Sequence, residues 1–300
     1  MPQDHDEFRR RGQLYMPDIG VLNLASLMQN FLLLNKFQAR IVGHPLKGRI
    51  VFLHGLMGYL NNWLSVTRAF ESEYEILTYD QRGHGKSVKN LVGYHPSDYA
   101  TDLLEIVDHL GWRKFHLVGH SMGGRNAIHF ASENPSRIEK LVVEDIGPSA
   151  RPEAIQGIIG ILDKVPTPFK SRDTMNSFFE KGVFEPTLNA YLKSNIEQKE
   201  GDQYDWRFER GAILESVTKG RTESSWEQWK AIQNPTLVIR GELSDELSLG
   251  EYQEMLAAAP LCIGVEIPGA AHWVHFDKPK EFIATLQNFF EGTLSASPTK

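Results

Sequence analysis

The stretch Val118-Gly119-His120-Ser121-Met122-Gly123-Gly124 constrains the fold more than any other part of the chain. It follows an apolar, strand-like run at residues 115–118 and precedes a helix-forming run at residues 126–132. A serine between two glycines at a strand-to-helix turn is typical of a nucleophile elbow, in which a strained backbone raises the hydroxyl above a sheet. Glycines are needed on both sides because side chains there would collide with the neighbouring strand and helix. The motif also occurs by chance, so the rest of the chain must decide whether Ser121 is a nucleophile.

Strand-like apolar runs alternate with helical runs along the chain. The run Ile-Val-Phe-Leu at residues 50–53 is apolar on both faces, as expected of a strand covered by helices on both sides. This alternation predicts an α/β fold, with a mostly parallel sheet and helices on both faces. The predicted strands are residues 37–42, 49–53, 74–79, 114–118, 138–143, 235–241 and 263–267.

The region from residue 149 to residue 231 differs in character from the rest. It is helical in pattern, rich in aromatic residues and free of strand-like runs. We expect an all-helical lid, inserted into a core formed by residues 36–148 and 232–291. Such a lid would exclude water and shape a substrate pocket at the carboxyl ends of the strands.

The two termini are assigned to separate segments. Residues 1–35 form an N-terminal extension that includes an uncharged stretch at residues 19–35, which polar residues interrupt too often for a membrane span. We expect an amphipathic helix packed on the domain or at a dimer contact; membrane association or an uncleaved targeting segment is the alternative. Residues 292–300 are expected to be a flexible tail. The expected protein is cytoplasmic and either a monomer or a homodimer.

Composition excludes several classes of function. The formal net charge is −6 over 300 residues, which gives no electrostatic footprint for nucleic acid. The only cysteine, Cys262, excludes an intramolecular disulfide and any CxxC site, and we expect it in the core. His275 lies three residues after His272, but no third metal ligand stands near them in the sequence. We therefore expect no metal and no cofactor.

A second turn supports Ser121 as the nucleophile. His54-Gly55-Leu56-Met57-Gly58 directly follows the buried strand at residues 50–53. An HG-x-x-G turn in this place supplies a backbone N–H to an oxyanion hole, here from Leu56, with Met122 supplying the other. His54 and His120 are expected to be structural. The glycine-rich turn at residues 80–87 lacks phosphate-loop spacing, and we expect it to tie adjacent loops together.

A serine hydroxyl needs an imidazole to take its proton and a carboxylate to hold that imidazole. His272 follows the last predicted strand, and Asp145 and Asp245 each follow another. Because the carboxyl ends of parallel strands meet at one edge of a sheet, these side chains are expected near Ser121.

Five motifs, together with a lid segment that contains Trp206-Arg207, resemble the α/β-hydrolase superfamily from about residue 36 to residue 290. The five motifs are HGLMG (54–58), YDQRGHGKS (79–87), GHSMGG (119–124), EDIGP (144–148) and AHWVHFDKP (271–279). Within that superfamily the chain most resembles YbfF-type esterases and their mitochondrial α/β-hydrolase-domain relatives, a group that includes the yeast ethanol acetyltransferases.

The resemblance implies a catalytic acid at Asp145, with Ser244 as an auxiliary hydrogen-bonding residue. Most of the superfamily instead places the acid after the strand that here ends at Gly241, where Ser244 and Asp245 stand. We favour Asp145 and keep Asp245 as the alternative.

The resemblance also implies the reaction: a serine hydrolase that cleaves short- to medium-chain carboxylic esters or thioesters through an acyl-enzyme. An alcohol acyltransferase that uses the same residues is one alternative. A ligand-binding or regulatory protein that retains the triad is another. Trp273, Trp206 and Phe184 are the candidates for substrate contact.

Overall fold

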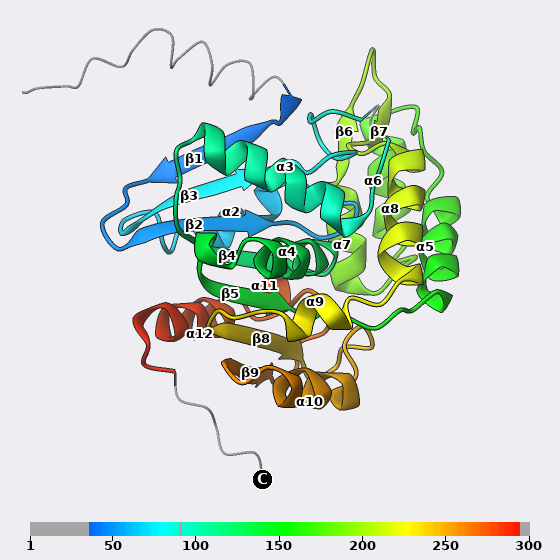
Figure 1. The fold of residues 1–300 in the computed structure, drawn as a ribbon. Helices are drawn as coiled ribbons and strands as arrows, with labels where there is room; N and C mark the ends of the chain where they lie inside the picture. Colours follow the sequence, from blue (N-terminus) through cyan, green and yellow to red (C-terminus); the bar gives the residue numbers. More distant parts are fainter. Residues whose placement is uncertain (1–35, 90–91, 295–300) are drawn as a thin grey trace, which may run out of the picture.

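The computed structural model describes residues 36–89 and 92–294 (Figure 1). The amphipathic helix expected within residues 1–35 and most of the expected tail therefore lie outside the described residues. In the part of the chain that is described, no helix combines the length and the apolar character needed to cross a membrane.

A seven-stranded sheet forms the centre of the molecule, in the order β1-β3-β2-β4-β5-β8-β9. The edge strand β1 pairs antiparallel with β3, whereas the other neighbours pair in parallel. The strands are β1 (Ala39–Gly43), β2 (Gly48–Leu53), β3 (Tyr74–Tyr79), β4 (Phe115–His120), β5 (Ile138–Glu144), β8 (Thr236–Gly241) and β9 (Cys262–Ile267). The sheet confirms the predicted α/β class, and each predicted strand overlaps an observed one.

Successive residues of the central strands face opposite sides of the sheet, so apolar runs bury both faces. Val51 and Leu117 pack into one hydrophobic cluster, while their neighbours Phe52 and Val118 pack into the other. All four side chains are fully buried, and burial of such a side chain stabilises the fold by about 1.5–3 kcal/mol.

Helices cover both faces of this sheet (Figure 1). The first face is covered by α3 (Pro96–His109), α4 (Met122–Glu133), α9 (Trp226–Lys230) and α10 (Leu249–Ala258). The second is covered by η1 (Leu60–Trp63), α2 (Leu64–Thr67), α11 (Val274–Asp277) and α12 (Pro279–Glu291). A short 3₁₀ turn, η2 (Pro135–Arg137), leads into β5.

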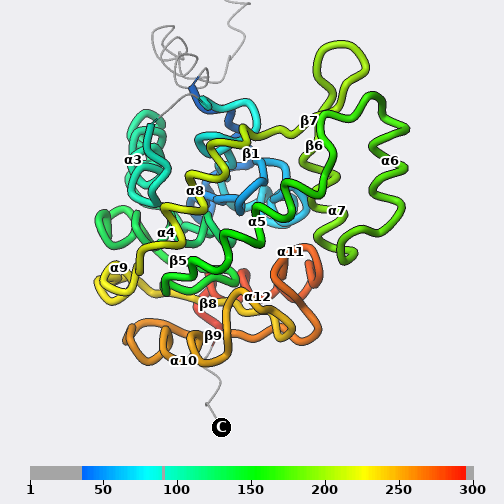
Figure 2. The backbone as a smooth tube through the Cα atoms, turned by 90° about the vertical axis from the view of Figure 1, so that its right-hand side faces the viewer, coloured from blue at the N-terminus to red at the C-terminus, as the bar shows by residue number. Residues whose placement is uncertain are grey.

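Residues 149–231, which we call the insertion, connect β5 to β8 and gather at one end of the sheet (Figures 1 and 2). Figure 2 looks onto this end of the molecule, where α5 and α8 lie in front of the strands and α6 lies to the right of them. The elements here are α5 (Glu153–Lys164), α6 (Arg172–Glu180), α7 (Pro186–Ser194), β6 (Ile196–Gln198), β7 (Tyr204–Trp206), α8 (Arg210–Thr222) and α9.

The sequence predicted an all-helical insertion, and this prediction was wrong. Strands β6 and β7 form an antiparallel hairpin in which Ile196 pairs with Trp206. Each strand has only three residues, which is too short for an alternating pattern to stand out from a helical one.

Cys262 begins the edge strand β9 and is partly buried rather than in the core. Burial nevertheless raises the pKa of its thiol to about 12, which keeps the sulfur protonated at neutral pH.

Candidate active site

Ser121 stands at the tip of the turn between β4 and α4, with a backbone φ of +53°. Non-glycine residues rarely adopt a positive φ, so the surrounding structure must hold this conformation. The two flanking glycines permit the turn. A Cβ on Gly119 would lie 2.3 Å from the carbonyl oxygen of Gly123, and one on Gly123 would lie 2.4 Å from that of Leu53.

A continuous chain of hydrogen bonds runs from Ser121 to Asp145. The Oγ atom of Ser121 lies 3.0 Å from Nε2 of His272, and Nδ1 of His272 lies 2.8 Å from Oδ2 of Asp145. Because an ionised carboxylate only accepts hydrogen bonds, Nδ1 carries the imidazole proton. Nε2 is then free to accept the proton of the serine hydroxyl.

Three donors hold the carboxylate of Asp145, which is fully buried. Besides His272, the N–H of Gly241 donates to Oδ1 at 2.9 Å and the hydroxyl of Ser244 donates to Oδ2. Asp145 itself has a φ of +52°, a second strained residue in the same site.

Asp245, the alternative acid, is exposed at the rim of the same cavity. Within the described residues its carboxylate makes no hydrogen bond with His272, whose Nδ1 bonds with Asp145. Ser244 lies where the sequence placed it, next to Asp145.

Two opposing effects set the basicity of His272. Burial disfavours the charged imidazole, but the hydrogen bond and the negative charge of Asp145 outweigh burial and raise the pKa of His272 above its ordinary value. A raised pKa makes the imidazole a stronger base for the serine proton.

Leu56 and Met122 both line the cavity beside Ser121. Met122 is the first residue of α4, where backbone N–H groups lack intrahelical partners. The Leu56 turn is held from two sides. His84 Nε2 accepts the N–H of Met57 at 3.2 Å, and the hydroxyl of Tyr191 donates to the carbonyl of Leu56 at 2.8 Å.

The glycine-rich turn at residues 80–87 braces this region, as expected. Gln81 donates its backbone N–H to His54 Nε2 at 3.0 Å and its side-chain amide to the His54 carbonyl at 2.7 Å. Asp80 accepts the N–H groups of Leu60 and Lys86, each at 2.8 Å. His54 therefore has a structural role in this loop.

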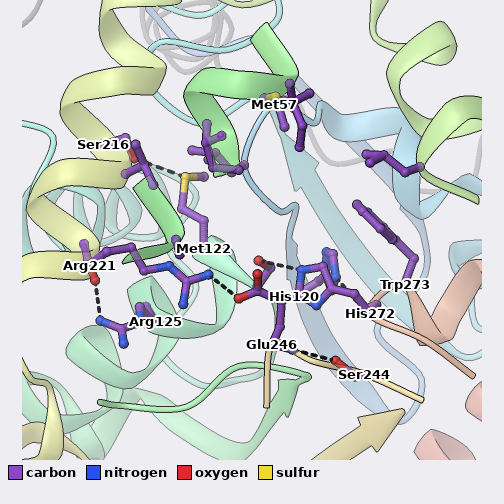
Figure 3. Close-up of a pocket in the computed structure, with 18 of the residues that line it drawn as sticks. Met57, His120, Met122, Arg125, Ser216, Arg221, Ser244, Glu246, His272 and Trp273 are labelled. Atoms are coloured by element: carbon purple, nitrogen blue, oxygen red, sulfur yellow. Dashed lines mark hydrogen bonds and ion pairs between the residues drawn. The ribbon is translucent and has the colours of Figure 1, made fainter. Parts of the chain in front are cut away.

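A cavity of about 420 Å³ opens above Ser121, between the sheet and the insertion (Figure 3). Ligand pockets in proteins commonly span about 300–1,000 Å³, so this cavity suits a small or medium-sized molecule. Its apolar wall is formed by Leu56, Ile158, Ile161, Leu188, Val217 and Leu243.

Of the three aromatic candidates for substrate contact, Trp273 lines the cavity, beside His272 (Figure 3). Trp206 does not: it is buried within the insertion and stacks on Phe208 at 4.8 Å. Phe184 packs against the same internal cluster, with the Lys164 ammonium 5.8 Å from its ring centre. The sequence prediction was wrong for these two because an aromatic residue looks the same whether it packs a lid or lines a pocket.

Sequence reasoning missed four charged residues at the cavity: Arg125, Glu185, Arg221 and Glu246. Figure 3 shows both arginines across the cavity from Trp273. Arg221 and Glu246 pair at 2.8 Å. Arg125 follows Ser121 by four residues, which is one turn of α4, and this spacing could have indicated it.

A group of potential metal ligands lies directly beneath the site: His120, Glu144 and His275. The sequence argument against a metal relied on the lack of a third ligand near His275, yet the fold supplies two more from distant strands. Hydrogen bonds engage the Glu144 carboxylate and one nitrogen of each imidazole. Burial disfavours the charged forms of Glu144 and His275. It raises the pKa of Glu144 to about 7 and lowers the pKa of His275 to about 3.

Comparison with known proteins identifies the class to which this strand order and this site belong. A sequence profile of the alpha/beta hydrolase fold family matches residues 48–279, and the chain belongs to this family.

Several relatives are named as esterases or lipases, which confirms the resemblance read from the motifs. The sn-1-specific diacylglycerol lipase ABHD11 of Danio rerio is 33% identical over 255 residues, covering 81% of this chain and 78% of that protein. Esterase YbfF of Escherichia coli is 28% identical over 250 residues, covering 80% and 92%. Among solved structures, a marine microorganism esterase matches with a TM-score of 0.74 and 28% identity, covering 85% of this chain and 99% of that one.

Proposed function

We propose that this chain is a serine hydrolase that cleaves short- to medium-chain carboxylic esters or thioesters through an acyl-enzyme. The hydrogen-bonded series Ser121, His272 and Asp145 is the observation that carries this proposal. The cavity above Ser121 and the names of the relatives support an ester substrate.

In this mechanism His272 takes the hydroxyl proton as Ser121 Oγ attacks the acyl carbonyl. The N–H groups of Leu56 and Met122 stabilise the oxyanion. The imidazolium then gives its proton to the departing alcohol or thiol, which leaves the acyl group on Ser121. His272 next removes a proton from water, which attacks the acyl carbonyl. The imidazolium then returns this proton to Ser121 Oγ as the carboxylic acid leaves, which restores both residues. Asp145 stabilises the imidazolium throughout.

The insertion acts as a lid in this proposal. Its helices α5, α7 and α8 contribute apolar side chains to the cavity wall, including Ile158, Leu188 and Val217. This wall excludes water from the acyl group and determines which chain lengths fit.

Hydrolysis of a p-nitrophenyl ester series from acetate upward, with a diacylglycerol included, tests the proposal. We expect turnover of the shorter esters, and a loss of at least about 10³-fold in the S121A variant, since the nucleophile is removed while the fold is kept. Wild-type turnover by S121A would refute the assignment. Formation of an ethyl ester in the presence of ethanol would instead identify an acyltransferase.

A further inference from the structure

Directly beneath the triad lies a second set of three side chains, each adjacent to a triad residue or close to it in sequence. His120 precedes Ser121, Glu144 precedes Asp145, and His275 follows His272 by three residues. All three are buried, with exposed fractions of 2%, 0% and 1%. None of them is needed for the proton transfers described above.

These side chains form hydrogen bonds with the segment that carries His272 at two points. The first is the backbone carbonyl of His272, which accepts a hydrogen bond from His120 Nε2 at 3.0 Å. Since a carbonyl only accepts, Nε2 of His120 carries the proton of this imidazole.

The second point is residue 275, in helix α11. The carboxylate of Glu144 accepts the backbone N–H of His275 at 2.9 Å and lies 2.7 Å from His275 Nδ1. The ring of His275 stacks on Trp63 at 4.3 Å, which fixes its orientation. Strands β4 and β5 thus hold the base loop at residue 272 itself and three residues further along the chain.

We propose that His120, Glu144 and His275 form a brace that positions His272 relative to Ser121 and Asp145. They are positioning residues, because they act on the backbone around the base and not on the substrate. This inference rests on the proposed function, in which His272 must meet two partners at 3.0 and 2.8 Å. A displacement of about 1 Å in such a geometry can lower a rate roughly 100-fold.

Two pairs of variants test the brace. H120L and E144M remove the hydrogen-bonding groups and keep an apolar side chain of comparable size. H120Q keeps a donor near the position of Nε2, and E144Q keeps an acceptor for the N–H of His275. The matched control is H116L, a buried histidine in the same strand β4, four residues from His120 and thus about 13 Å further along the strand.

We expect H120L and E144M to lower kcat at least about tenfold. KM should stay within about twofold in E144M, because Glu144 does not line the cavity, whereas His120 lines it and H120L can also change KM through contact with the substrate. The acid limb of kcat/KM of both variants should move to lower pH, because a displaced His272 loses the partner that raises its pKa. H120Q and E144Q should keep kcat within about threefold of the wild-type value. H116L should keep both the wild-type kcat and the wild-type position of the acid limb of kcat/KM.

If H120L or E144M does not fold, H275F replaces it. This variant keeps the stacking on Trp63 and the backbone N–H bond, and a several-fold fall in kcat is expected. The brace is overturned if folded H120L and E144M keep wild-type kcat and the same acid limb. It is also overturned if a chelator abolishes activity and Zn²⁺ restores it, since the three residues would then hold a metal.

Labelling of Ser121 by a fluorophosphonate separates this inference from the proposed function. Labelling needs the serine and its imidazole but no particular ester. If no ester is turned over, the proposed function fails, yet slower labelling of H120L and E144M than of H116L would still support the brace. Equal labelling rates would overturn it.

Discussion

Asp145 receives three hydrogen bonds at a strained backbone position, and this combination separates it from the other carboxylate that follows a strand. Gly241 and Ser244 leave the carboxylate little freedom to rotate, so Oδ2 stays aligned with the imidazole. Asp245 has no comparable set of donors among the described residues and faces solvent.

We therefore expect D145N to lower kcat by roughly 10³-fold or more, because an amide neither stabilises the imidazolium nor fixes its tautomer. D245N should keep kcat within about twofold. The acid limb of kcat/KM, measured where activity remains, should lie at lower pH in D145N. Asp145 raises the pKa of His272, and catalysis needs the neutral imidazole, so removal of its charge lets the base stay neutral at lower pH. A D245N enzyme with the larger loss would reverse the assignment.

At the scale of elements, Arg125 connects helix α4, which follows Ser121, to both ends of the insertion. Its guanidinium donates to the carbonyl of Ser149, where the insertion begins, and to that of Gly220, near the end of α8. It reaches the carbonyl of Glu223 at 3.4 Å as well. The side chain is 2% exposed, and burial lowers its pKa to about 9.

Substitution of Arg125 by Met should loosen the insertion, since it removes the donor from partly buried carbonyls, and a fully buried carbonyl without a donor costs about 1–3 kcal/mol. We expect trypsin to cut R125M within residues 149–231 faster than the wild type, and KM to rise several-fold. Limited proteolysis followed by mass spectrometry measures the first effect. R137M, which removes an arginine that pairs with Asp108 outside the cavity, is the control. Identical cleavage of R125M and wild type would contradict this role.

Elements were predicted well where one physical pattern dominated. The strands were predicted because apolar runs buried on both faces have few alternatives. The proximity of Ser121 and His272 was predicted because an elbow and a late loop need particular residues. The choice between Asp145 and Asp245 stayed open, since both follow strands and only the fold shows which one reaches His272. The hairpin β6–β7 and the true surroundings of Trp206 depend on tertiary packing that three-residue strands do not reveal.

At the scale of the whole molecule, buried neutral histidines link stability to pH. His84 is fully buried: its Nε2 accepts the N–H of Met57, and its Nδ1 lies 2.8 Å from the carbonyl of Arg82. Protonation of Nε2 would destroy that acceptor. Burial accordingly lowers the pKa of His84 to about 4, and burial also lowers the pKa of His54 well below its usual range.

An unfolded histidine titrates near pH 6.5, so the unfolded chain binds more protons than the folded one between about pH 6.5 and pH 4. The free energy of unfolding should therefore fall as pH drops from 7 to 5, by about 2 kcal/mol for His84 alone. H84Q keeps an acceptor but does not titrate, and its loss between pH 7 and pH 5 should be smaller by that amount. Urea denaturation at the two pH values measures this difference. Equal losses in H84Q and wild type would show that His84 makes no such contribution.

The hydroxyl of Tyr191 belongs to the insertion, while the carbonyl of Leu56 belongs to the turn beside Ser121, and 2.8 Å separates them. Raising α7 away from the sheet would break this bond and free the carbonyl of Leu56, next to the peptide that carries the Leu56 N–H, at the moment when solvent enters. In an open molecule, substrate could enter while the turn at Leu56 lacks this hydrogen bond. Closure of α7 would restore the bond and fix the turn again beside Ser121. Substrate entry and the reaction would therefore need different positions of α7. A bulky ester that keeps α7 away from the sheet would occupy the cavity without reacting and so act as an inhibitor.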